Sequence, residues 1–129
     1  MARLRWLWPL VFAALLVCST QRLAPGPRSD PQLITENEVV ASLATTAYEL
    51  IHRLRPNFLT YRGETSFDRS KSQPYPTVYV DGQEFGPIGT LRNIPATQIA
   101  TIRLYLSWEA TTKFGSGKMG GVIAITTRR

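Results

Sequence analysis

The chain has 129 residues, which is enough for one domain and short for two. Its composition, with 43% hydrophobic and 19% charged residues, is ordinary for a globular protein, and the formal net charge of +6 is dispersed along the chain. The single cysteine excludes an intramolecular disulfide, and the single histidine excludes a metal site built from several histidines. A dispersed basic surface favours anionic partners such as lipopolysaccharide or phospholipid, but without a recognition motif we expect no nucleic-acid partner.

The first residues carry the pattern of an export signal. Arg3 and Arg5 precede an uncharged apolar run at residues 6–17. This run has 12 residues, whereas a membrane-spanning helix needs about 20. A positive start followed by an apolar run of this length is typical of a signal peptide, here residues 1–18. The alternative is a buried core helix, but polar, proline-rich sequence follows at once, so we expect an exported protein, either periplasmic or an outer-membrane lipoprotein.

Cys18 stands where the apolar run ends, and residues 15–18 read Leu-Leu-Val-Cys. This sequence resembles a bacterial lipobox, in which the cysteine is acylated after the signal peptide is cleaved. Val17 departs from that pattern, which prefers a smaller residue, and the alternative is ordinary signal-peptidase cleavage, for example after Ser19. We predict lipidation of Cys18, followed by a flexible, proline-rich linker over residues 19–34 that holds the folded domain away from a membrane.

Residues 35–55 predict one amphipathic helix. Thr35 and Glu38 have the spacing of a capping box, in which each side chain meets the backbone N–H of the other residue. Pro56 ends the helix, because proline lacks the N–H that a helix interior needs. The apolar residues that recur at helical spacing form one stripe: Val40, Leu43, Ala44, Ala47, Leu50, Ile51 and Leu54. His52 falls in the last turn, where we expect a surface residue rather than a metal ligand.

Residues 61–75 are polar and lack periodicity, which predicts a loop. Loops carry binding residues more often than cores do. Three cations of this loop are therefore candidate contacts with a partner: Arg62, Arg69 and Lys71. The alternative is a tolerated excursion of the chain that has no role in binding.

The C-terminal half predicts a small sheet. Residues 76–80 are rich in β-branched and aromatic side chains, and Asp81-Gly82 then predicts a hairpin, because the tight turn needs positive φ. Further elements follow in order: a turn at 86–89, a short helix at 96–99, a strand at 101–106, a helix or turn at 108–114, a glycine loop at 115–121 and a strand at 122–127. This order indicates an α+β fold, with one small domain over residues 35–129 that holds a short mixed sheet and two or three helices.

Several groups of residues recur in an order that a known family shares. They are Val78-Tyr79-Val80-Asp81-Gly82, Leu91 with Ile94-Pro95, Ile99 with Ile102-Arg103, Phe114-Gly115-Ser116-Gly117, and Gly120-Gly121 with the strand that follows. Together they resemble the plug domain of TonB-dependent outer-membrane receptors, over about residues 35–129. In that family the plug closes a large β-barrel that transports iron chelates, cobalamin, sugars or peptides. A TonB box links the plug to an energy-transducing protein of the inner membrane.

The chain also departs from that family. It stops at Arg129, where a receptor would begin its barrel, residues 19–34 show no TonB box, and Ser107-Trp108-Glu109 stands in place of the usual Lys-Gly-Pro. We therefore expect a free-standing relative rather than a transporter, namely a non-enzymatic envelope protein whose plug-like domain is a protein-interaction module. Its expected partner is an envelope protein, such as an outer-membrane β-barrel or a TonB-like protein. The alternative is an accessory ligand-binding or gating protein for a separate outer-membrane transport barrel.

The sequence contains no residue pattern that indicates a catalytic or cofactor-binding site. Lys118 and the glycines before it suggest a phosphate-binding loop, but that pattern needs glycine at 112 and Ser or Thr at 119, where the chain has Thr112 and Met119. No carboxylate is accompanied by the histidine or reactive cysteine that would build a nucleophile and its base, so we expect no enzymatic activity, cofactor or metal. Tyr105 and Trp108 are either core aromatics or anchors of a binding surface.

Overall fold

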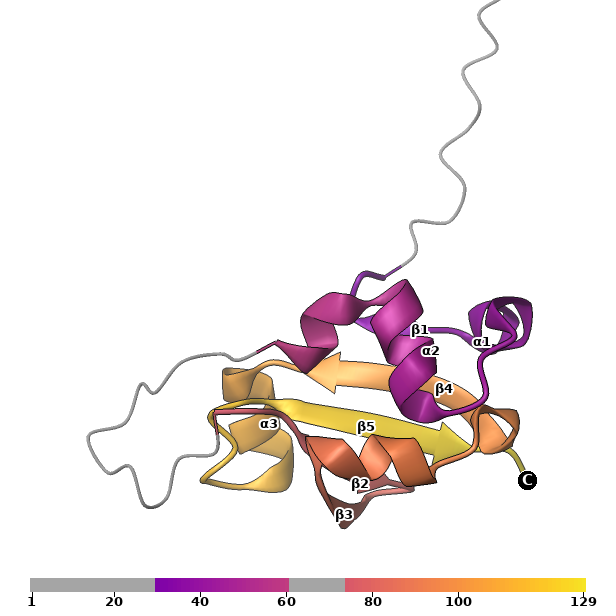
Figure 1. Cartoon of the computed structure of the whole chain (residues 1–129). Coiled ribbons are helices and arrows are strands. Elements are labelled where there is room, and N and C mark those ends of the chain that lie inside the picture. The colour runs from indigo at the N-terminus through magenta and orange to yellow at the C-terminus, as the bar shows by residue number, and fades with distance from the viewer. Residues whose placement is uncertain (1–29, 61–73) are drawn as a thin grey trace, which may run out of the picture.

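The described part of the chain, residues 30–60 and 74–129 of the computed structural model, contains a mixed β-sheet. Its strands are β1 (Leu33–Ile34), β2 (Thr77–Val80), β3 (Gln83–Pro87), β4 (Ile99–Tyr105) and β5 (Val122–Thr127). They lie in the order β1-β4-β5-β2-β3, with β2 and β5 parallel and the other neighbours antiparallel (Figure 1). The predicted signal peptide, Cys18 and most of the predicted loop at 61–75 lie outside the described residues.

The two longest strands, β4 and β5, are rich in the β-branched residues that suit a pleated surface. They pair with Ile102 opposite Ile125 and Leu104 opposite Ile123. All four side chains are buried on one face of the sheet, where they form the floor of the main core. β5 matches the predicted strand, and β4 begins two residues before its predicted start.

The hairpin predicted from Asp81-Gly82 joins β2 to β3. Both turn residues have positive φ, 49° at Asp81 and 84° at Gly82, as a tight two-residue turn needs. The turn is also fastened to β5, because the hydroxyl and the backbone N–H of Thr127 donate to the two carboxylate oxygens of Asp81 at 2.6 and 3.0 Å. These two hydrogen bonds lower the pKa of Asp81 below its ordinary value.

Helices cover both faces of the sheet. Within the two described ranges they are α1 (Glu36–Ser42), α2 (Ala47–Leu54), α3 (Ser107–Phe114) and the 3-10 helices η1 (Pro56–Leu59), η2 (Ile88–Asn93) and η3 (Ala96–Gln98). α1 and α2 lie over one face and α3 lies on the other (Figure 1). The main core includes fully buried side chains from α2, η1 and η2: Leu50, Ile51, Phe58 and Leu91. No helix in these ranges is both long enough and apolar enough to cross a membrane.

The single predicted N-terminal helix is wrong, because the chain forms two helices with a break between them. Leu43 ends α1 in a left-handed conformation with a φ of 51°. Thr46 begins α2 by accepting a hydrogen bond from the N–H of Glu49 at 3.3 Å. The break also pairs with distant backbone, since the N–H of Ala47 donates to the carbonyl of Ile94 at 2.8 Å. A continuous helix would have to give up this tertiary pairing.

The break changes which apolar residues are buried. α2 turns Leu50 and Ile51 fully into the core, as the predicted stripe requires. In α1 Val40 is 58% exposed, and Leu43, which caps the end of α1, is 87% exposed. The predicted stripe therefore holds for α2 and fails at these two positions.

The last two residues of the predicted linker belong to the sheet. Leu33 and Ile34 form β1 opposite Arg103 and Ile102 of β4, and Ile34 is fully buried. Two residues are too few to show the alternation by which a strand is recognised in a sequence. His52 is exposed in the last turn of α2, as predicted.

Candidate functional site

Two of the predicted interaction residues lie in the described part of the chain. Tyr105 ends β4 and is partly buried, whereas Trp108 lies in the first turn of α3 and is 68% exposed. Trp108 is therefore a surface residue and not a core aromatic. The others lie outside the described residues: Arg62, Arg69 and Lys71, together with the predicted lipidation site Cys18.

Tyr105 belongs to an aromatic cluster on the face of the sheet that α3 covers. Its ring centroid lies 5.4 Å from that of Phe114, edge to face, and Phe114 lies 4.5 Å from Tyr79. The buried side chains of Ala110 and Val122 pack in the same cluster. Tilted and edge-to-face contacts are the favoured geometries of aromatic pairs, so this packing holds the ring of Tyr105 in place.

Two cations flank Tyr105. Lys113 Nζ donates to the Tyr105 hydroxyl at 2.6 Å and lies 4.5 Å from the ring centroid, and Arg103 Cζ lies 5.4 Å from the same centroid. Arg103 and Tyr105 are two residues apart on β4, so their side chains emerge on the same face. Lys113 comes from the last turn of α3, where a cation also suits the helix dipole. Two separate elements thus bring positive charge to one tyrosine.

A cavity of about 510 Å³ opens on this face beside α3. Its lining comes mainly from β4, β5, α3 and the turn between β2 and β3. We call its cations and aromatic side chains the cationic sheet face: Arg103, Tyr105, Lys113, Phe114 and Arg129. The one carboxylate in the lining is Asp81, which accepts two hydrogen bonds from Thr127 that lower its pKa and favour its charged form. The lining therefore holds three cations and one carboxylate, which leaves the cavity with a net positive charge.

Lys118, the lysine of the glycine loop, makes a different contact. Its ammonium group donates to Glu84 Oε2 at 2.8 Å, and the Tyr79 hydroxyl donates to the same oxygen at 3.0 Å. Partial burial acts to lower the pKa of Lys118, but its hydrogen bonds to Glu84 and Tyr79 outweigh burial and raise the pKa. The bonds from Lys118 and Tyr79 lower the pKa of Glu84. This ion pair fastens the glycine loop to the hairpin.

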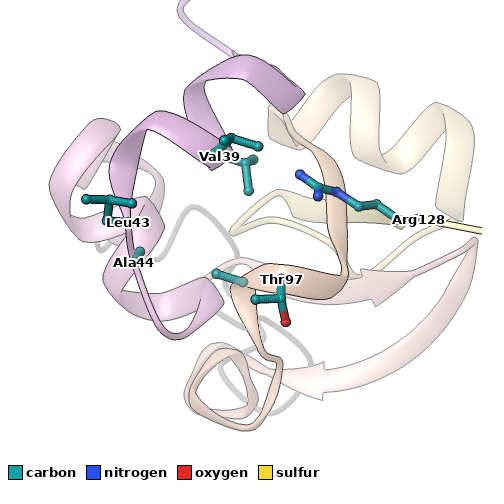
Figure 2. A pocket seen from close by; sticks show the side chains of 7 residues that line it. Val39, Leu43, Ala44, Thr97 and Arg128 are labelled. Carbon is teal, nitrogen blue, oxygen red and sulfur yellow. The ribbon is translucent and has the colours of Figure 1, made fainter.

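A second concave surface, with a volume of about 260 Å³, lies between α1 and η3. We call it the apolar groove, and it consists of Val39, Val40, Leu43, Ala44, Ala96, Thr97 and Arg128. Figure 2 shows the guanidinium of Arg128 reaching toward the hollow from the side opposite Leu43. Arg128 is held by a hydrogen bond from its Nε to the carbonyl of Ile99 at 3.0 Å and by Glu36 Oε1, 3.3 Å away.

Sequence reasoning missed most residues of both surfaces. Alternation along β4 places Arg103 on the same face as Tyr105, and this signal could have found it. Lys113 and Arg129 line the cavity because of where α3 and the residues after β5 pack, and no local pattern encodes that. Val40 and Leu43 carried a misleading signal, because their helical spacing predicted burial.

The described residues offer groups suited to binding. Within residues 30–60 and 74–129, no three His, Cys, Asp or Glu side chains gather as a metal site would require. The cationic sheet face supplies N–H donors and positive charge, and the apolar groove supplies hydrophobic surface beside one guanidinium. No family model, no curated protein and no solved structure matches this chain.

Proposed function

We propose that this chain is a non-enzymatic envelope protein whose plug-like domain is a protein-interaction module, and that the apolar groove is its docking site. The observation that carries the proposal is Leu43, which is 87% exposed beside the groove and has a left-handed backbone. The resemblance to receptor plugs supports the envelope setting. An outer-membrane β-barrel or a TonB-like protein is the proposed partner.

Leu43 is unfavourable as the isolated domain presents it. A left-handed conformation costs a residue other than glycine about 1–2 kcal/mol. An exposed leucine also forgoes the roughly 1.5–3 kcal/mol that full burial contributes. Val40, 58% exposed, adds a second large apolar side chain to the same groove. A partner that covers both side chains would gain this burial, so the strained conformation is suited to a complex.

Arg128 indicates which kind of segment fits the groove. It is the one charged residue in the lining. Its Nε contacts Ile99 and Glu36, while its terminal nitrogens point toward the hollow (Figure 2). A guanidinium pairs well with a carboxylate, and arginine is common among the residues that dominate binding energy. The proposed partner therefore presents an apolar side chain with a carboxylate next to it.

The test is affinity capture of the tagged full chain from cross-linked, detergent-solubilised envelopes, with mass spectrometry of the recovered proteins. Leu43→Ser removes the exposed apolar side chain from the groove. Phe85→Ser is the matched control, because Phe85 is 50% exposed and lines neither surface. We expect Leu43→Ser to reduce recovery of the partner by about tenfold. Phe85→Ser is expected to leave it within about twofold.

Urea unfolding of both variants tests whether the fold is retained. Equal recovery with the wild type and with Leu43→Ser contradicts the docking site, and so does a wild-type chain that recovers no partner. Recovery of a large β-barrel that Leu43→Ser does not reduce would favour an accessory or gating role for that barrel instead.

A further inference from the structure

We infer that the cationic sheet face is a binding site for a small organic phosphate, which would occupy the cavity of about 510 Å³. This site shares no lining residue with the apolar groove, so the inference goes beyond the docking function and does not depend on it. Three cations, the size of the cavity and its aromatic wall carry the inference.

The cations of this site differ from most other cations of the described residues. Several basic residues form ion pairs with a glutamate: Arg53, Arg55, Lys118 and Arg128. Within the described ranges, no such ion pair involves the cations of the cationic sheet face: Arg103, Lys113 and Arg129. The cavity lining also holds one carboxylate, Asp81, whose charge interacts with Arg129, so three cations face one carboxylate and the net charge is positive. Net positive charge gathered in a cavity raises the local concentration of anions.

The arrangement of the cations favours phosphate over a single carboxylate. Arg103 extends from β4, Lys113 from α3, and Arg129 follows β5, so each comes from a different part of the chain. A phosphate ester presents three acceptor oxygens and carries a charge of about −1.5 to −2 at neutral pH. Its tetrahedral oxygens can accept from three donors at once, whereas a planar carboxylate matches one guanidinium.

The cavity has room for more than the phosphate group. Its volume of about 510 Å³ lies within the range of roughly 300–1,000 Å³ that is typical of small-molecule sites. Tyr105 and Phe114, in edge-to-face contact, form an apolar wall beside the cations. The Tyr105 hydroxyl, held by Lys113, adds a polar group at this wall. The carbon skeleton of an ester would lie against the two rings.

The probe is glycerol 3-phosphate, titrated into the full chain in non-ionic detergent and followed by two-dimensional NMR of the backbone N–H groups. We expect saturable shifts at Arg103 and Ala124, which line the cavity, and none at Val40 in the apolar groove. Glycerol, which has no charge, is expected to cause no saturable shift. Acetate, with one carboxylate, is expected to bind about tenfold more weakly than glycerol 3-phosphate.

Two double variants separate a site from a general effect of charge. Arg103→Gln with Lys113→Gln removes two cations of the site, and we expect binding to weaken by about tenfold. Arg53→Gln with Arg92→Gln makes the same change in net charge away from the cavity, and we expect a change within about twofold, because distant exposed charges are screened. Arg129→Gln, outside the sheet, provides the same test if the first variant does not fold.

Three results would overturn the inference. They are wild-type shifts that do not saturate, equal weakening in both double variants, and acetate binding as tightly as glycerol 3-phosphate. Binding of phosphatidylglycerol vesicles by a chain that does not bind glycerol 3-phosphate would also overturn it, since the cations would then recognise a membrane surface.

Discussion

Gly121 closes the glycine loop against the end of β4, and its replacement by alanine has a defined structural consequence. The residue is buried with a φ of 89°, and a Cβ atom added there would lie 2.6 Å from the carbonyl oxygen of Tyr105. This oxygen belongs to the backbone, so it cannot move aside as the end of a flexible side chain can. Gly121→Ala must therefore displace either the loop or the end of β4.

The expected loss of unfolding free energy has two parts, and variants at two other glycines measure them separately. The left-handed conformation costs alanine about 1–2 kcal/mol, and the displaced backbone adds about 1–3 kcal/mol. Gly117 has the same φ of 89° but open space around it, so Gly117→Ala should lose the first part alone. Gly89 has open space and an ordinary φ, so Gly89→Ala should be neutral or stabilising by up to about 1 kcal/mol.

The assay is urea unfolding of the full chain followed by circular dichroism. Single domains have free energies of unfolding of about 5–15 kcal/mol, so a loss of about 2–5 kcal/mol for Gly121→Ala would shift the midpoint strongly. We expect Gly89→Ala to be the most stable of the three variants, Gly117→Ala to be less stable and Gly121→Ala to be the least stable. If Gly121→Ala loses no more than Gly117→Ala, the close approach to Tyr105 has no energetic weight, and the reasoning is refuted.

Two further predictions concern the helices. Leu50→Ala should lower the free energy of unfolding by about 2–5 kcal/mol, because Leu50 is fully buried. Val40→Ala should change it by less than about 0.5 kcal/mol in the same urea experiment, because Val40 is exposed. Equal losses of unfolding free energy in the two variants would contradict the exposed position of Val40. The N–H of Thr35 donates to the Glu38 carboxylate, and with Arg55 it outweighs the effect of partial burial, so the pKa of Glu38 lies below 4.5 in the folded protein. The stability that this carboxylate contributes is therefore present above that pH and is lost as the pH falls through the lower folded-state pKa. Between about pH 5 and pH 3, Glu38→Gln should therefore lose less stability than the wild type. Identical profiles of unfolding free energy against pH for the two proteins would argue against a stabilising role of the Glu38 carboxylate.

Local signals were sufficient for much of the sheet. Asp-Gly tolerates the positive φ that a two-residue hairpin turn needs, so the turn at Asp81-Gly82 could be predicted from this dipeptide and the strand-like runs beside it. All residues of β5 except Ala124 are β-branched, and the strand begins and ends where this run does. β1 could not be predicted, because Leu33 and Ile34 are a strand only by virtue of pairing with Arg103 and Ile102.

The break between α1 and α2 shows how a correct local signal can mislead. The apolar residues keep helical spacing across the break, so periodicity alone predicts one helix. A second capping signal was present, since Thr46 precedes Glu49 by three residues and caps α2. What decides the break is tertiary, because the N–H of Ala47 pairs with the carbonyl of Ile94, far along the chain.

The candidate site was predictable in part. Tyr105 was predicted as either a core or a binding aromatic, and in the structure it packs on Phe114 and also lines the cavity. Its relation to Lys113 depends on how α3 folds back across the sheet, which no pattern within α3 determines. The apolar groove was beyond prediction for a similar reason, since it exists because α1 leaves the direction of α2.

The position of β5 has a consequence for how the domain is made. Although it is the last described strand along the chain, it lies between β4 and β2 and is the sole link between the β1–β4 pair and the β2–β3 hairpin. Until residues 122–127 are available, the sheet consists of two separate two-stranded pieces, and such pieces are at best marginally stable in water. The domain therefore cannot close progressively from its N-terminus as it is synthesised. Its sheet assembles in one late step, when the final strand enters the gap.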